Sequence, residues 1–133
     1  MKTIICSFLI AASILAACNG GSGSGSGGDQ TTPTGVANMI FDAAKSGDYS
    51  QLKNLCHDSL VSDGDSRKVC QIADGDEKGK SSFKEYFSTG KVVGEPTIAG
   101  EEASVNITFG PDGTKEETLK MQKKDGKWYL YSF

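Results

Sequence analysis

The sequence has little of what several common functions require. Its 133 residues include one histidine, one tryptophan and three prolines, and no basic run is longer than Lys123-Lys124. A single histidine leaves a zinc site short of ligands at metal-binding spacing and gives a catalytic base no identifiable partner. Without a basic cluster there is no electrostatic footprint for nucleic acid and no polybasic patch for anionic lipid. We therefore expect an acidic protein with no metal, no cofactor and no nucleic-acid partner.

The chain also lacks an apolar run long enough to cross a bilayer. Its longest apolar segment, residues 4–17, has 14 residues, whereas a membrane-spanning helix needs about 20. Lys2 precedes this segment, so residues 1–17 have the positive start and the apolar length of a secretory signal peptide. Removal of Lys2 with the signal changes the net charge from −3 to −4. The sequence thus predicts an exported protein.

The apolar segment ends in Leu15-Ala16-Ala17-Cys18, which resembles the lipobox of bacterial lipoproteins. The resemblance implies a diacylglyceryl group on the Cys18 thiol, cleavage before Cys18, and acylation of the new amino group, for example with palmitate. Several acyl chains give stable membrane anchoring, where one chain is marginal. Asn19, in place of an aspartate, implies the outer membrane. We predict a lipid-anchored protein of the cell envelope, facing the periplasm or the surface; the alternative is a secreted protein with a chance match.

The segment after the lipobox is built to be flexible. Residues 20–28 are only glycine and serine, and residues 29–32 are polar. Such a composition cannot bury enough surface to offset its conformational entropy. We predict a linker over residues 18–32, with a root-mean-square reach of roughly 20 Å, and one folded domain over residues 33–133.

The four cysteines have three expected roles. Cys6 lies within the signal, and Cys18 is the lipidation site. Cys56 and Cys70 then remain as a pair in the folded part of an exported protein, where disulfides form and persist. A bridge closing a loop of about 15 residues stabilises a fold by roughly 3 kcal/mol in the chain-entropy model. The alternative is two buried free thiols.

Apolar periodicity predicts helices in the first half of the domain. A stripe at helical spacing favours a helix over residues 34–46, with Thr34 as N-cap and Gly47 as its end. Asp48 is the expected cap of a second, shorter helix. Residues 57–80 contain turn-prone acidic stretches, and we expect Val69, Cys70 and Ile72 between them to contact the core. The acidic stretches lack the order of an EF-hand loop, which favours solvated turns over a calcium site. A further helical turn, starting at Ser81 or Ser82, carries Phe83 and Phe87 on one face.

After Gly90 the apolar period changes to two, which predicts strands. The expected strands cover residues 91–98, 103–109, 115–123 and 127–133, with Pro96 favouring an edge position or bulge in the first. Gly110-Pro111-Asp112-Gly113 and Asp125-Gly126 are turn signals. Helices followed by a hairpin-connected meander predict an α+β fold, with N-terminal helices packed on a curved antiparallel four-stranded sheet.

Two short motifs add a family resemblance. Ser46-Gly47-Asp48-Tyr49 follows the first helix, and Asp125-Gly126-Lys127-Trp128-Tyr129 opens the last strand. In this order, residues 33–133 resemble bacterial lipoprotein domains of the DUF4878 type, within the NTF2-like (cystatin-like) superfamily. The resemblance implies a helical layer wrapped by a curved sheet, often with an open pocket, and no common activity.

Aromatic side chains are the candidates to line such a pocket. Tyr86 and Phe87 are one pair, and Tyr129 and Tyr131 are the other. In the last strand, alternation places Trp128 and Leu130 on one face and Tyr129, Tyr131 and Phe133 on the opposite face. Aromatic stripes more often form core than sites, so packing competes with the pocket interpretation.

The leading hypothesis is a lipid-anchored envelope protein whose domain binds a small ligand or an envelope protein without catalysis. An alternative is a small NTF2-like enzyme, in which His57, an aspartate and a tyrosine would converge on one cavity; we predict no catalytic residue. A third is a structural or inhibitory protein that docks through its exposed sheet face. The oligomeric state is not determined by the residues, although NTF2-like domains often pair as homodimers through their sheets.

Overall fold

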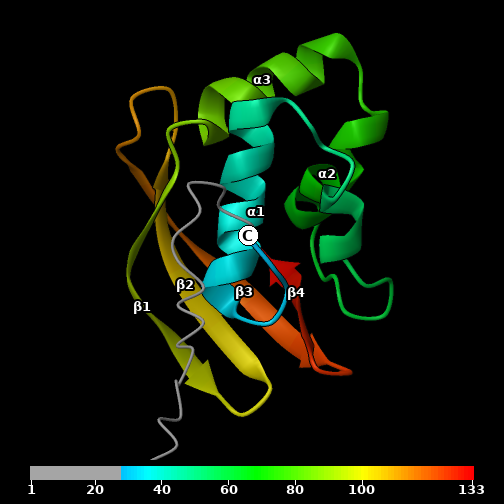
Figure 1. Cartoon of the computed structure of the whole chain (residues 1–133), viewed down its shortest axis with the longest axis vertical. Helices are drawn as coiled ribbons and strands as arrows, with labels where there is room; N and C mark the ends of the chain where they lie inside the picture. The colour runs from blue at the N-terminus through cyan, green and yellow to red at the C-terminus, as the bar shows by residue number, and fades with distance from the viewer. Residues whose placement is uncertain (1–27) are drawn as a thin grey trace, which may run out of the picture.

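The computed structural model describes residues 28–133, which form helices followed by one antiparallel sheet (Figure 1). The predicted signal, Cys18 and most of the predicted linker lie outside the described residues. The elements are α1 (Pro33–Ser46), η1 (Leu52–Leu55), α2 (Gly64–Gln71), η2 (Ile72–Asp74), α3 (Glu77–Phe87), β1 (Lys91–Ala99), β2 (Glu102–Phe109), β3 (Lys115–Lys124) and β4 (Lys127–Ser132). The predicted α+β class is therefore confirmed. No helix within residues 28–133 has the length and apolarity to cross a membrane.

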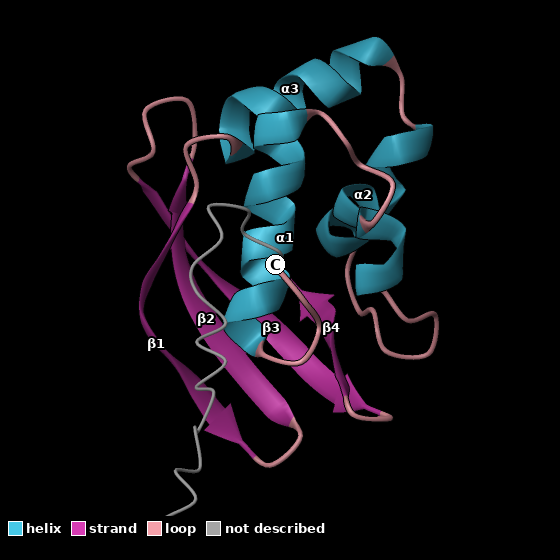
Figure 2. Cartoon of the chain, viewed as in Figure 1, coloured by secondary structure: helices cyan, strands magenta, loops and turns pink. Residues whose placement is uncertain are grey.

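The sheet is a meander in the order β1-β2-β3-β4, with every neighbouring pair antiparallel (Figure 2). The register of β1 on β2 shifts between Val93 and Thr97, where Pro96 favoured an edge position or a bulge. Asp125 and Gly126 have φ angles of 52° and 79°, the left-handed conformation of a tight hairpin turn. Turn chemistry in the sequence therefore sets where β3 ends and β4 begins.

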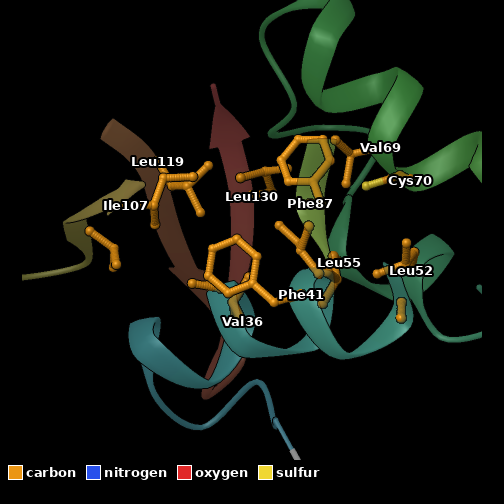
Figure 3. Packing of buried hydrophobic residues seen from close by; sticks show 14 of the residues in the cluster. Val36, Phe41, Leu52, Leu55, Val69, Cys70, Phe87, Ile107, Leu119 and Leu130 are labelled. Atoms are coloured by element: carbon orange, nitrogen blue, oxygen red, sulfur yellow. The ribbon is translucent and has the colours of Figure 1, made fainter. Parts of the chain in front are cut away.

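The helices cover one face of the sheet, and the core lies between the two layers (Figures 1 and 3). The predicted inward residues of β2 and β3 are buried, which confirms the alternation found in the sequence. The α1 stripe packs against them. The fully enclosed apolar side chains include Val36, Ile40, Leu52, Leu55, Val105, Ile107, Leu119, Met121 and Leu130.

The first helix begins one residue earlier than predicted. Thr32, not Thr34, is the N-cap: its hydroxyl accepts a hydrogen bond from the Gly35 amide at 3.0 Å. The fixed φ of Pro33 suits the first helical position, so the residue before it must be the cap. Gly47 ends the helix with a φ of 78°, as the sequence predicted.

The positions of η1, α2 and α3 correct the interpretation of residues 48–82. The expected second helix is the single 3₁₀ turn η1, because the Asp48 carboxylate accepts from the Ser50 amide and forms a local turn instead of a helix cap. Asp63 is the N-cap of α2, a helix that the sequence interpretation missed. Asp76 is the N-cap of α3, which therefore begins at Glu77, ahead of the predicted Ser81 or Ser82. The acidic stretches read as turns thus include two helix starts.

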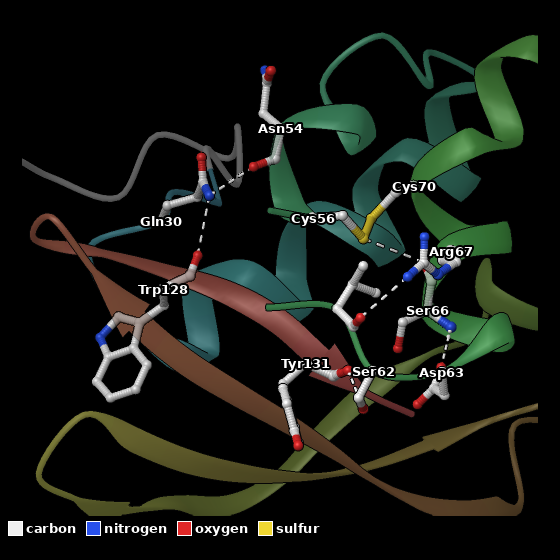
Figure 4. Close-up of a disulfide and its surroundings, with 11 residues drawn as sticks. Gln30, Asn54, Cys56, Ser62, Asp63, Ser66, Arg67, Cys70, Trp128 and Tyr131 are labelled. Carbon is white, nitrogen blue, oxygen red and sulfur yellow. Dashed lines mark hydrogen bonds between the residues drawn. A yellow bond between two sulfur atoms is a disulfide. The ribbon is translucent and has the colours of Figure 1, made fainter. Parts of the chain in front are cut away.

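The chain covers the outer edge of β4 with the segment before α1 (Figure 4). The Trp128 amide donates to the Gln30 carbonyl at 2.8 Å. The Gln30 side-chain amide donates to the carbonyls of Trp128 and Asn54, at 3.1 and 2.9 Å. Gln30, within the predicted linker, therefore contacts the domain and pairs groups that an open sheet edge would expose.

Candidate functional site

A cleft of about 870 Å³ opens where α2 and α3 meet the end of the sheet. Its volume is within the usual range of ligand sites, roughly 300–1,000 Å³. Five aromatic side chains line it together with two aliphatic ones, and polar groups stand among them. The lining residues that matter below are Asp65, Lys68, Val69, Ile72, Asp74, Ser82, Phe83, Tyr86, Phe87, Phe109, Lys115, Glu117 and Phe133.

Four phenylalanine rings form the apolar wall of the cleft. Phe83 and Phe87, one helical turn apart on α3, have ring centroids 4.8 Å apart, and Phe87 stacks on Phe109 at 5.2 Å. The Phe133 ring lies 5.7 Å from Phe87 and 5.5 Å from Phe109. The wall thus combines the end of α3, the end of β2 and the last residue of the chain.

The position of Phe133 corrects the simple alternation expected in the last strand. Lys120 pairs with Ser132 and Met121 with Leu130, so Tyr131 is an extra residue on β4. Such a bulge reverses the side on which later residues point. Phe133 therefore turns toward the aromatic wall, whereas the sequence placed it with Tyr129 and Tyr131.

Asp63 fastens the chain end to α2. One carboxylate oxygen accepts from the Ser66 amide at 2.7 Å as the helix cap, and the other accepts from the Phe133 amide at 2.9 Å. Partial burial opposes ionisation of this carboxyl, but these backbone hydrogen bonds outweigh burial and lower the pKa of Asp63. The ionised form therefore holds two walls of the cleft together.

Substitutions at Asp63 separate these two bonds. We expect Asp63→Ala to cost about 2 kcal/mol of unfolding free energy, and Asp63→Asn about 1 kcal/mol, because asparagine keeps the cap acceptor but loses the oxygen that accepts from Phe133. Because the folded pKa is lowered, the wild-type contribution is complete above the unfolded value, near pH 4, and is lost as the pH falls through the folded pKa. Urea unfolding at pH 7 and pH 3 measures this; an Asp63→Asn deficit that persists unchanged at pH 3 would contradict it.

The two cysteines predicted to pair lie at bonding distance, with their Cα atoms 6.0 Å apart (Figure 4). Cys56 directly follows η1, and Cys70 lies on α2 beside Val69, which borders the cleft. α2 has only two apolar buried residues, Val69 and Cys70. The bridge therefore holds the helix that forms one wall of the cleft.

The structure brings together only part of the predicted pocket. Tyr86 and Phe87 border the cleft, and 42% of the Tyr86 surface is exposed. Tyr129 and Tyr131 are not among its lining residues; Tyr129 instead makes an edge contact with the His57 ring at 5.3 Å. His57 Nδ1 lies 2.8 Å from the Ser59 hydroxyl, and His57 does not border the cleft either. The candidate site is thus separate from the histidine.

Charged side chains stand around the apolar wall. Lys68 forms an ion pair with Asp65 at 2.8 Å. Lys115 Nζ lies 4.7 Å from the centroid of the Phe109 ring, over its face. Asp74 and Glu117 form no ion pair with any residue of the described part of the chain. No group of three or more His, Cys, Asp or Glu within residues 28–133 could hold a metal ion.

The cleft includes residues that the sequence did not identify as site residues, among them Phe109, Phe133, Val69 and Lys115. In the sequence, Phe109 was one of several inward-facing positions of a predicted strand and did not stand out as a site residue. Its signal was its place at the end of the alternation, next to Gly110, where the strand ends and its buried ring borders the cleft. The position of Phe133 could be predicted only with knowledge of the bulge at Tyr131, and no residue in the sequence indicates that bulge.

Two solved structures resemble the chain. A candidate NTF2-like transpeptidase from Campylobacter jejuni matches with a TM-score of 0.49 and 19% identity, over 74% of this chain and 96% of that one. A protein with a SEC-C motif from Rhodopseudomonas palustris matches with a TM-score of 0.49 and 14% identity, over 78% of each chain. No family model and no curated protein matches the chain, so the DUF4878-type resemblance stays a prediction. At these levels of similarity neither structure transfers an activity.

Proposed function

We propose that this chain is a lipid-anchored protein of the bacterial cell envelope whose domain binds an apolar ligand in the cleft, without catalysing a reaction. The observation that carries the binding role is the aromatic wall formed by Phe83, Phe87, Phe109 and Phe133 on an open cleft of about 870 Å³. Ligand sites are typically concave, mostly apolar, and bordered by a few polar groups. His57, which the enzyme alternative would place in the cavity, contacts Tyr129 and Ser59 instead of this cleft.

Support for the anchor comes from the sequence alone. Leu15-Ala16-Ala17-Cys18 has the lipobox order, and the glycine-serine segment after it provides a spacer between membrane and domain. Asn19 favours the outer membrane by the same resemblance. The anchor confines the domain to the envelope, the oxidising compartment in which the Cys56–Cys70 bridge persists.

The anchor is tested by metabolic labelling. We expect Cys18→Ser to abolish incorporation of a labelled fatty acid and cleavage before residue 18, because the thiol is the only group there that a lipid transferase can alkylate. Cys6→Ser, which removes the signal's other thiol, should leave labelling and cleavage unchanged. Label that persists in Cys18→Ser, or that is absent from the wild type, would contradict the lipobox interpretation.

The cleft is tested by filling it. Ser82 is exposed, borders the cleft and lies on α3, so Ser82→Trp places a large ring there without disturbing the core. We expect it to weaken binding of N-phenyl-1-naphthylamine, a neutral apolar fluorophore, about tenfold, which corresponds to about 1.4 kcal/mol.

Ser81→Trp is the matched control, because Ser81 is equally exposed on the same helix and does not border the cleft. It should bind the fluorophore as the wild type does. Equal binding by the Ser81→Trp and Ser82→Trp proteins would place the fluorophore elsewhere and would contradict the proposed site.

A further inference from the structure

The charges at the mouth of the cleft indicate the charge of its ligand in addition to its apolar character. Lys68 is neutralised by its ion pair with Asp65. The remaining charged lining residues are Asp74 and Glu117, which have no ion-pair partner in residues 28–133, and Lys115. Two carboxylates against one ammonium leave this aromatic cleft with an excess negative charge. A ligand with a positive group would complement it.

The aromatic wall already holds a positive charge of the protein's own. Lys115 Nζ lies over the Phe109 ring at 4.7 Å from its centroid, which is within the usual distance for a cation–π contact. Such contacts contribute about 0.5–1 kcal/mol where water has access, and more where it is excluded. The Phe109 face is therefore suited to an ammonium group, and a flexible lysine side chain occupies it.

Glu117 lies on the same face of the sheet as this ring. It is directly opposite Ile107 in the register of β2 and β3, and Ile107 is a core residue with 1% of its surface exposed. Residues directly opposite each other in an antiparallel pair share one face. Glu117 thus points to the cleft side, two residues from Lys115, where it can attract a cation that replaces Lys115 on the ring.

We propose that the cleft binds an organic ammonium group carried on an apolar body. The aromatic wall takes the apolar part, the Phe109 face takes the ammonium group in place of Lys115, and the carboxylates of Glu117 and Asp74 supply the opposite charge. This inference rests on the proposed function, since it names the chemical class of ligand for that same cleft. A small amine, a choline-type headgroup and a basic side chain of a peptide all offer this chemistry.

Three probes of similar shape and different charge test the inference. They are benzyltrimethylammonium, benzyl alcohol and phenylacetate, each titrated into the mature chain from residue 18 to 133 carrying Cys18→Ser, with binding followed by calorimetry. We expect the cation to bind about five times more tightly than the neutral alcohol, and the anion to bind most weakly. A fivefold preference corresponds to about 1 kcal/mol, the size of a partly exposed charge contact.

Matched variants assign the preference to named residues. Glu117→Gln should lower the affinity for the cation about three- to fivefold, and Lys115→Gln should raise it by a similar factor, because it vacates the ring and removes a like charge. Glu116→Gln and Lys120→Gln make the same charge changes on the opposite face of β3, where these residues lie opposite Thr108 and Ser104, and should have little effect.

The outcomes separate the two proposals. Binding of benzyl alcohol without a preference for the cation, or tighter binding of phenylacetate, would overturn the ammonium inference and leave the apolar cleft in place. A failure of all three probes to bind would overturn the proposed function itself. Equal effects of Glu117→Gln and Glu116→Gln would show that only the net charge of the protein matters, which also contradicts the inference.

The same assay distinguishes between two sources of the ammonium group, a peptide and a choline-type headgroup. A hexapeptide with one lysine beside a phenylalanine, and short-chain phosphocholine, are titrated against the Ser82→Trp variant and the wild type. We expect at least one of them to compete with benzyltrimethylammonium for the wild-type cleft and to lose affinity in Ser82→Trp. Competition by neither would contradict an ammonium group as the recognised chemistry.

Discussion

Gly90→Ala is expected to destabilise the domain by about 3 kcal/mol, at the upper end of what overpacking a core costs. Gly90 is buried between α3 and β1, and a Cβ atom built on it would overlap Cδ1 and Cε1 of the Phe41 ring. Phe41, on α1, has 2% of its surface exposed and cannot move without displacing the core. Urea unfolding of the variant and the wild type measures the difference.

The interpretation of that result needs a control and a partner variant. Gly64→Ala, in the first turn of α2, has nothing within 4 Å of its new Cβ and should be neutral or stabilising by up to about 1 kcal/mol, because alanine reduces the freedom of the unfolded chain. Phe41→Leu should recover part of the cost of Gly90→Ala, which appears as a coupling energy in a double-mutant cycle. Additive effects of the two changes would contradict the proposed clash.

Removal of the disulfide by Cys56→Ala with Cys70→Ala should also cost roughly 3 kcal/mol, the chain-entropy value for a loop of about 15 residues. The loss of stability should affect α2 in particular as well as the whole domain. α2 has few buried apolar contacts of its own, so amide hydrogen exchange in α2 should accelerate more than in β2 and β3 under native conditions.

A reducing agent provides the control for the disulfide. It should lower the stability of the wild type and leave the double variant unchanged. Equal stability of the oxidised and reduced wild-type protein, or uniform acceleration of exchange across α2 and the sheet, would contradict a role of the bridge in holding the wall of the cleft.

The sheet could be predicted from the sequence because its determinants are local. Alternation from Ala103 to Phe109 and the turn at Asp125-Gly126 act within a few residues, and the structure places the strand and the turn there. The first helix was predicted for the same reason, with its apolar stripe and its terminal Gly47. In these segments local propensity and the final packing agree.

The cleft could be predicted only in part because it depends on contacts between distant residues. α2 has too few apolar residues for a helical pattern; the Asp63 cap and the Cys56–Cys70 bridge hold it in place. Phe133 joins the wall through the bulge at Tyr131 and the bond from its amide to Asp63, 70 residues earlier. Phe87 shares a helix face with Phe83 by its spacing alone, so the aromatic part of α3 could be recognised from the sequence.

We propose that this protein binds its ligand in the cleft between α2, α3 and Phe133. Amide and aromatic NMR signals of the mature Cys18→Ser chain, followed during titration with benzyl alcohol, test this claim most directly. We predict saturable shifts that cluster on Val69, Phe83, Phe87, Phe109 and Phe133 and that require about tenfold more ligand in Ser82→Trp. Shifts centred on Tyr129 and Tyr131, or shifts that do not saturate, would contradict it.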